Sequence, residues 1–220
     1  MPTPSCSAHP THPGLAVALL GLAATLGLTG PAVAQPAAPP ANPGITTTAP
    51  NGWWKNGSKV AAYVVGVDRV QTHAGKPSAY VKSIEPAVDG FGGMMQMCAA
   101  DAYHGKRLRL SAWMKTENAN DGGAHLWFRV DGRDQGQMLQ FDNMDNRPLK
   151  GSSDWQQVAI VLDVSPNAAA LAYGFFVGGT GQAWVSALML EEVGPEVPTT
   201  DVTAAAHRRL PTAPVNLGFD

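Results

Sequence analysis

Cysteine is scarce in this chain, which excludes a disulfide framework. Two cysteines occur in 220 residues, Cys6 and Cys98. Cys6 precedes an apolar run that we expect to be cleaved away, so the mature chain holds one cysteine and no internal disulfide. Cys98 has no base beside it in the sequence, and we interpret it as a small buried apolar residue rather than a catalytic thiol.

Charge is also low, and no excess of one sign exists. Charged residues make up 15% of the chain and the formal net charge is -2. A protein that binds nucleic acid or an acidic membrane normally carries a basic patch. The composition therefore predicts no nucleic-acid partner, and no membrane insertion once the leader is removed.

The common catalytic and metal-binding motifs are missing as well. The sequence contains no HExxH, no GxSxG, no phosphate-binding loop, and no GxGxxG between a strand and a helix. The histidines form no i, i+4 pair, which argues against zinc. We expect no cofactor. Loop oxygens in 131–134 and 142–146 leave a structural calcium ion open, although Asx turns explain the same residues.

The two ends of the chain differ from its middle. An apolar run at 15–28 is followed by Ala32-Val33-Ala34, the pattern of a signal peptidase site. We therefore predict a signal peptide at 1–34 and a periplasmic or extracellular (secreted) protein, with an uncleaved membrane anchor as the alternative. Residues 35–51 are rich in Pro, Ala and Thr and predict an extended, mobile linker. The folded domain is expected at 52–193, with a tail at 194–220.

Within 52–193, sustained helical periodicity is lacking and short apolar segments alternate with turn signals. About nine strands are expected, and Ser165–Ala170 is expected to hold a short helical turn. Many short strands with regular turns are typical of an antiparallel β-sandwich or barrel. The expected strands lie at 59–67, 78–84, 92–99, 106–115, 125–130, 138–141, 155–164, 169–177 and 183–191.

Lys106–Val130 is the most informative stretch. It predicts two strands joined by a polar loop, and each strand alternates an aliphatic face with a mixed aromatic and basic face. If the two strands pair as neighbours, the mixed faces bring five side chains together. This predicted ligand-binding set comprises Trp113, Trp127, Arg109, Arg129 and His125.

Three stretches resemble carbohydrate-binding modules and galactose-binding-like jelly rolls of secreted bacterial proteins. Tyr103–Lys115 resembles that family's Y-x-G-K-x-Y-x-L-S-x-W-x-K strand, Asp154–Val158 its x-W-Q-x-V/Y strand, and Ala183–Leu188 its closing W-V-D-D-V strand. In the closing strand, Ser186 and Ala187 replace two acidic residues that often help bind a structural cation. The resemblance implies an all-β jelly roll over about 53–193.

The resemblance implies a non-catalytic module that binds a glycan or polysaccharide. Sugar rings stack on aromatic faces, and basic or polar groups hydrogen-bond their hydroxyls. Two alternatives remain open: a small secreted polysaccharide lyase or hydrolase using His125, Arg109 and Arg129, and a module that docks a protein partner.

The remaining tryptophans and the C-terminal end have their own interpretations. We expect Trp155 and Trp184 in packing roles. Of Trp53 and Trp54, we expect one to cover the core and the other to be partly exposed. The final segment, 214–220, is hypothesised to return as a strand beside this pair.

Overall fold

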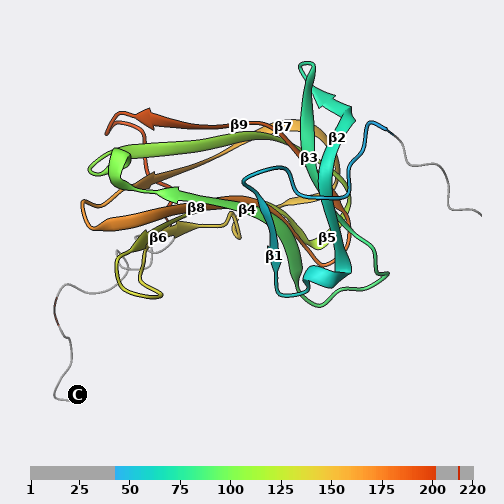
Figure 1. The fold of residues 1–220 in the computed structure, drawn as a ribbon, viewed down its shortest axis with the longest axis horizontal. Helices are drawn as coiled ribbons and strands as arrows, with labels where there is room; N and C mark the ends of the chain where they lie inside the picture. Colours follow the sequence, from blue (N-terminus) through green and yellow to red (C-terminus); the bar gives the residue numbers. More distant parts are fainter. Residues whose placement is uncertain (1–42, 202–212, 214–220) are drawn as a thin grey trace, which may run out of the picture. The chain divides into compact units, whose positions relative to one another are not determined.

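The computed structural model describes residues 43–201 and residue 213, all within one compact unit, Pro40–Asp220. Their regular elements are strands and two short 3-10 helices (Figure 1). In chain order these are β1 (Trp54–Gly57), η1 (Val60–Ala62), β2 (Tyr63–His73), β3 (Lys76–Ser83), β4 (Phe91–Ala99), η2 (Asp101–Tyr103), β5 (Arg107–Gly132), β6 (Met138–Asp142), β7 (Leu149–Asp163), β8 (Ala168–Gly178) and β9 (Gln182–Val193). Within the described ranges, no helix has the length and apolar character needed to cross a membrane.

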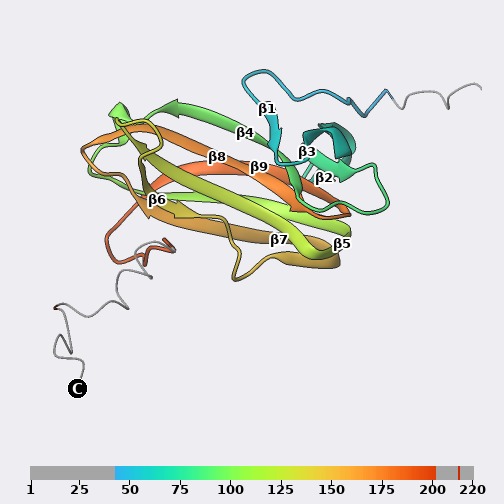
Figure 2. The same cartoon turned by 90° about the horizontal axis from the view of Figure 1, so that it is seen from below.

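The strands form two antiparallel layers that share the long strand β5. The first half of β5 pairs with β7 on one side and with β9 on the other, and β3 and β2 follow β9. The second half pairs with β6 and β8, and β4 and β1 follow β8. Figure 2 shows β4 and β8 in one layer and β7 in the other. The predicted fold class, an antiparallel β-sandwich of jelly-roll type, is confirmed.

The core lies between the layers and follows the predicted alternation along β5. The aliphatic residues of both halves are buried against residues of β7 and β8. Because side chains alternate between the two faces of a strand, the remaining residues of β5 lie on the outer faces. The buried residues are Leu108, Leu110, Ala112 and Met114 in the first half, and Leu126, Phe128 and Val130 in the second.

The connection inside β5 differs from the prediction. The polar segment was expected to be a loop between two paired strands, but the backbone continues as one strand that bends from one layer into the other. Thr116 still pairs with Ser153 and with Ala183, and the register shifts between residues 114 and 124. Asn118 and Gly123 have positive φ values of 51° and 70° within the bend.

The folded domain is also wider than the predicted 52–193. In the segment expected to be a mobile linker, the Thr46 N–H donates to the Val67 carbonyl at 2.8 Å, and the Arg69 N–H donates to the Gly44 carbonyl at 2.7 Å. Backbone pairing with an edge strand orders these residues despite their composition. In the expected tail, the Thr200 N–H donates to the Val161 carbonyl at 2.8 Å. The predicted signal peptide and the hypothesised returning strand at 214–220 lie outside the described residues.

The structure tests the predictions made for Trp53 and Trp54 and for Ser165–Ala170. Trp53 packs on the core, with its ring 5.9 Å from that of Tyr173, whereas Trp54 is 45% exposed, as expected for the pair. The expected helical turn at Ser165–Ala170 is instead a tight turn closed by the Ala168 N–H donating to the Ser165 carbonyl at 3.0 Å, and β8 begins at once.

Candidate functional site

The structure divides the five predicted site residues between two outer faces. Arg109 and Trp113 lie on the first half of β5, in the layer with β7 and β9. His125, Trp127 and Arg129 lie on the second half, in the layer with β6 and β8. The expected single cluster depended on the two segments pairing as neighbours, and they do not pair.

Trp113 and Arg109 have their interacting groups occupied within the protein. The indole of Trp113 stacks on the imidazole of His73, with ring centroids 4.2 Å apart and planes inclined by 20°. Trp155 lies against the same imidazole at 5.5 Å. Arg109 forms an ion pair with Glu191, Nη2 to Oε1 2.8 Å. One face of the Trp113 indole is therefore covered by His73, although the side chain as a whole remains partly exposed.

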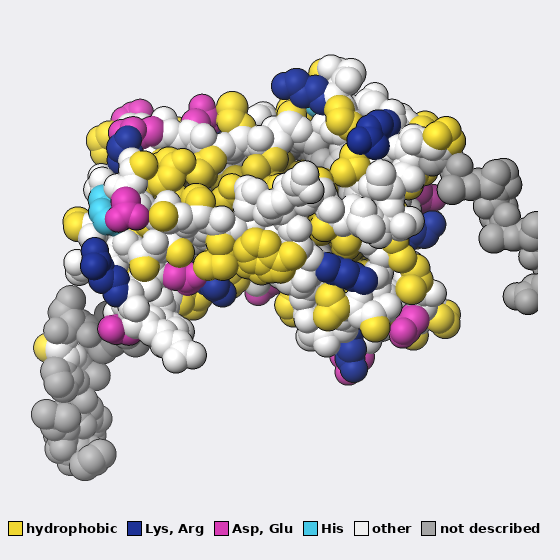
Figure 3. Space-filling model, in the orientation of Figure 1, with side chains coloured by type: hydrophobic (Ala, Val, Ile, Leu, Met, Phe, Trp, Pro, Cys, Tyr) yellow, Lys and Arg dark blue, Asp and Glu magenta, His cyan; other side chains and the backbone are white. Residues whose placement is uncertain are grey.

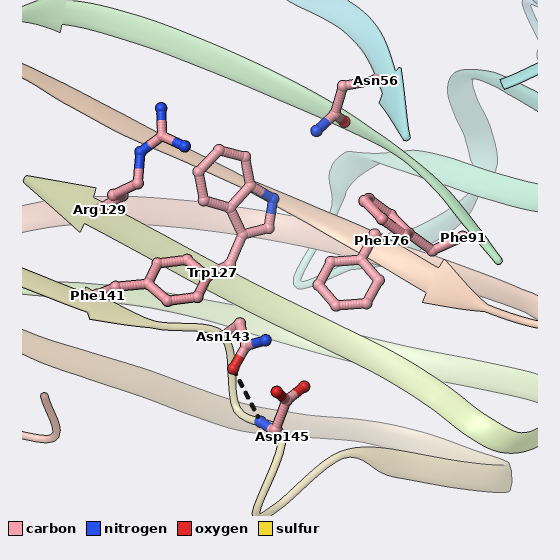
Figure 4. Close-up of a pocket in the computed structure, with 8 residues that line it drawn as sticks. All are labelled: Asn56, Phe91, Trp127, Arg129, Phe141, Asn143, Asp145 and Phe176. Atoms are coloured by element: carbon pink, nitrogen blue, oxygen red, sulfur yellow. Dashed lines mark hydrogen bonds between the residues drawn. The ribbon is translucent and has the colours of Figure 1, made fainter. Parts of the chain in front are cut away.

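Trp127 and Arg129 line an open cavity of about 350 Å³ on the outer face of the second layer (Figure 4). We call this cavity the Trp127 groove. Its walls come from β1, β4, β5, β6 and β8 and from the loop after β6. They are formed by Asn56, Phe91, Trp127, Arg129, Phe141, Asn143, Asp145 and Phe176. Figure 3 shows hydrophobic side chains gathered on the face that carries β4 and β8.

The strand register explains why the surface is hollow beside Trp127. Trp127 is opposite Gly174 of β8, and Gly174 is opposite Met95 of β4. Two residues further along β8, Phe176 is opposite Gly93. Glycine leaves the centre of the sheet bare between large side chains. A Cβ on Gly174 would lie 2.1 Å from the Met94 carbonyl oxygen, so this part of the floor has no room for a side chain.

Polar groups stand among the aromatic walls. Asn56 Oδ1 is buried and accepts no hydrogen bond from any described residue. Arg129 forms a two-point ion pair with Asp131, Nε to Oδ1 2.7 Å and Nη2 to Oδ2 2.9 Å. The groove therefore combines flat apolar surfaces with an unused acceptor and a locally neutralised cation.

The loop that carries Asn143 and Asp145 is fixed by a buried ion pair. Asp142 has 0% exposure, and its carboxylate accepts from Arg147 Nη2 at 2.6 Å. The Met144 N–H donates to Asp142 Oδ1 at 2.8 Å. A buried charge is tolerated when it is paired and hydrogen-bonded in this way. This side of the groove is accordingly held in place before any ligand arrives.

His125 is buried beside the groove and contacts two of the residues that line it. Its Nδ1 is 2.8 Å from the Asn143 carbonyl and its Nε2 is 2.7 Å from the Gly122 carbonyl. The ring stacks on Phe176 at 4.3 Å, with planes inclined by 9°. A neutral imidazole has a single N–H, so both contacts are hydrogen bonds only when the ring is protonated. The His125 side chain is buried and positions two groove residues rather than facing a ligand.

Most of the groove residues carry no strong signal in the sequence. Phe91, Phe141 and Phe176 were missed, together with Asn56 and the loop residues. Strand parity offered one signal: in β8, Phe175 and Val177 point into the core, which leaves Gly174 and Phe176 on the outer face. Five separate strands converge on this face because of the strand order in the sheet. Local sequence patterns do not specify that order.

The oxygen-rich loops form internal contacts instead of a shared metal cage. Asp131 binds Arg129, Asp142 binds Arg147, and Asn143 Oδ1 accepts from the Asp145 N–H at 3.3 Å. Within 43–201, no three His, Cys, Asp or Glu side chains gather as a metal site would require.

The fold and the cavity together define a jelly-roll β-sandwich with an aromatic groove on one outer face. No family model matches the chain. Among curated proteins, it is similar to the uncharacterized HTH-type transcriptional regulator YbfP of Bacillus subtilis strain 168, with 42% identity over 170 residues. The match covers 77% of this chain and 56% of that protein, so the chain spans little more than half of this relative.

Solved structures with a similar layout are more distant. The enzymatically active domain of bacteriophage CBA120 tailspike protein 4 has 16% identity and a TM-score of 0.49, over 65% of this chain and 20% of that one. The CBM22-1 xylan-binding domain of Paenibacillus barcinonensis Xyn10C has 16% identity and a TM-score of 0.48, over 66% and 88%. TmCBM61, solved with β-1,4-galactotriose, has 14% identity and a TM-score of 0.43, over 65% and 90%. Carbohydrate-binding modules, the class that the sequence resembles, thus recur among these structures.

Proposed function

We propose that the sandwich is a non-catalytic carbohydrate-binding module and that the Trp127 groove holds the ligand. The observation that carries this proposal is the convergence of four aromatic residues, Trp127, Phe91, Phe141 and Phe176, around one open cavity. Ligand sites are typically concave, mostly apolar and about 300–1,000 Å³ in volume, with a few polar groups that fix orientation. The groove has these properties.

The chemistry of the walls favours a sugar over a purely apolar ligand. Aromatic faces accept the C–H surface of a sugar ring, while hydroxyl groups need donors and acceptors around its edge. The orphan Oδ1 of Asn56 is an acceptor of the kind that a sugar hydroxyl satisfies. In Figure 4, the indole nitrogen of Trp127 faces the space between Asn56, Phe91 and Phe176, where it is placed to donate.

The arrangement gives less support to the enzymatic alternative. The His125 side chain is buried and each ring nitrogen lies within 2.8 Å of a backbone carbonyl, so neither nitrogen is open to a substrate for proton transfer. Arg109, a member of the proposed catalytic set, lies in the other layer. Of the carboxylates near the groove, that of Asp131 is paired with Arg129.

Binding to a glycan array by wild type, Trp127→Ala and Trp113→Ala tests the proposal. We expect the wild type to bind a subset of glycans. Trp127→Ala should lose at least about tenfold in affinity, because a central aromatic contributes about 2 kcal/mol or more to such a site. Trp113→Ala should bind like the wild type. Circular dichroism checks that both variants fold, and equal binding by wild type and Trp127→Ala would remove the groove from consideration.

A second candidate function follows from the similarity to YbfP. A match of 170 residues within 220 necessarily includes most of the sandwich, and residues 43–201 contain only strands and two 3-10 helices. The part of the shared region that the structure describes is therefore not a helix-turn-helix. In a regulator, this part would be the domain that binds a ligand.

The predicted leader favours the first function. A signal peptide at 1–34 would take the module out of the cytoplasm, where polysaccharides are accessible and chromosomal DNA is not. Cell fractionation with an antibody against the sandwich tests this placement. Recovery of the unprocessed chain in the cytoplasm would favour the sensing function.

A further inference from the structure

We propose that the ligand is a linear oligosaccharide lying across the strands, and that Trp54 provides a second stacking subsite at the far end of the Trp127 groove. This inference rests on the proposed function and specifies its ligand class. From the sequence, one residue of the Trp53–Trp54 pair was expected to be partly exposed; this residue is Trp54, and it is not among the residues that line the cavity.

The register places the two tryptophans in one row on the same face. Trp54 of β1 is opposite Met95 of β4, Met95 is opposite Gly174 of β8, and Gly174 is opposite Trp127 of β5. Residues directly opposite each other on neighbouring strands project from the same face of a sheet. Asn56, which lines the cavity, lies two residues after Trp54 and so projects on the same side.

The spacing determines how long the ligand must be. Three strand-to-strand steps separate β5 from β1, which places the Trp54 and Trp127 backbones about 14 Å apart. A monosaccharide or disaccharide bound at Trp127 does not reach Trp54, whereas a longer linear chain laid across β8 and β4 contacts both indoles. Along this path Gly174 has no side chain and Met95 is half-buried.

The exposure of Trp54 suits a binding role. Its side chain is 45% exposed on a short edge strand, although the neighbouring Trp53 packs on the core. Leaving a large aromatic side chain in water gives up the free energy of burial, and such residues beside a groove often mark a binding surface. Asn56, two residues from Trp54 on β1, projects from the same face, and its buried Oδ1 offers an acceptor to a sugar hydroxyl beside this subsite.

Calorimetric titration with oligosaccharides of increasing length tests this inference. The probes are cello-, xylo- and galacto-oligosaccharides from the disaccharide to the hexasaccharide, chosen by array binding. For the wild type, affinity should rise at least about fivefold once the chain spans both indoles. In Trp54→Ala, that rise should disappear while disaccharide affinity is unchanged. Val70→Ala, a change at a 60% exposed side chain on β2, is the control and should behave as the wild type.

The outcomes separate this inference from the proposed function. If the wild type binds none of the glycans, the carbohydrate-binding function itself is wrong. If the wild type and Trp54→Ala gain equally with length, the proposed function stands and the Trp54 subsite is wrong. If disaccharide affinity also falls in Trp54→Ala, Trp54 belongs to the Trp127 subsite and the two-subsite arrangement is wrong.

Discussion

Single residues of the same type serve different purposes in this sandwich, because strand position decides what each one contacts. Trp113 and Trp127 both alternate with core residues of β5, so the sequence pattern predicts the same outward-facing position for both. Trp113 is partly exposed with one ring face against His73, whereas Trp127 is only 6% exposed but lines an open cavity. Strand parity identifies both as outward-facing, but the covering of Trp113 depends on the end of the β2 strand, 40 residues earlier in the chain.

Tyr63 shows how a buried polar residue links stability to pH. Its side chain has 0% exposure, and its hydroxyl donates to the Gly179 carbonyl at 2.6 Å. Burial, with a smaller effect from the charge of Glu85, raises the pKa of Tyr63 from 10.0 to about 12. Because the folded state holds this proton more tightly than the unfolded state, the associated stability is complete below pH 10 and is lost as the pH rises toward 12.

We predict that Tyr63→Phe is less stable than the wild type by about 1 kcal/mol at pH 7, from the lost hydrogen bond. Urea unfolding at pH 7, 10 and 11.5 measures this difference. The stability difference between the two proteins should shrink as the pH rises. Only the wild type has the Tyr63 hydroxyl, and keeping that group protonated in the folded state costs free energy at high pH. Tyr80 and Tyr173 are present in both proteins, so their contributions to the pH dependence of stability cancel in the comparison. A difference that does not change with pH would contradict the assigned pKa.

At the scale of elements, the bend in β5 joins the two layers and separates the two outer faces. Gly123 has a φ of 70° in this bend, and a Cβ there would lie 2.8 Å from Pro148 Cβ. Gly151 has a φ of 69° in β7, but a Cβ there would meet no atom within 4 Å. The two glycines thus share the same backbone requirement and differ in the space around them.

Gly123→Ala should therefore destabilise the domain more than Gly151→Ala does. The left-handed backbone costs a non-glycine residue roughly 1–2 kcal/mol at either position. At residue 123, the contact with Pro148 adds about 1–3 kcal/mol from overpacking. Thermal and urea unfolding of both variants measure the difference. Equal destabilisation would mean that the bend is loose enough to absorb a methyl group.

The elements also show what the sequence predicts well. Alternating apolar residues identified eight of the nine strands, because one buried face leaves a clear period of two. β1 was missed because it has four residues with little alternation. The bend in β5 was read as a loop because Asn, Asp and Gly are typical of turns, whereas here they hold a strand that changes layers.

At the scale of the whole molecule, the groove is a product of strand order. β1, β4, β8, β5 and β6 come from positions far apart in the chain, and their adjacency places Asn56 near Phe91, Phe176 and Trp127. The sequence resemblance anticipated the jelly roll, but not which strands lie side by side. For that reason Trp127 and Arg129 were found in advance, and the other groove residues were not.

The tryptophans give the most direct test of this account, because all six of them lie in the described domain. A ¹H–¹⁵N spectrum records one indole N–H signal for each, and titration with a hexasaccharide selected on the array shows which signals move. We predict large shifts for Trp127 and Trp54 and small ones for Trp113, Trp155 and Trp184. Shifts confined to Trp113 and Trp155 would place the ligand on the opposite layer and contradict the assignment of the groove.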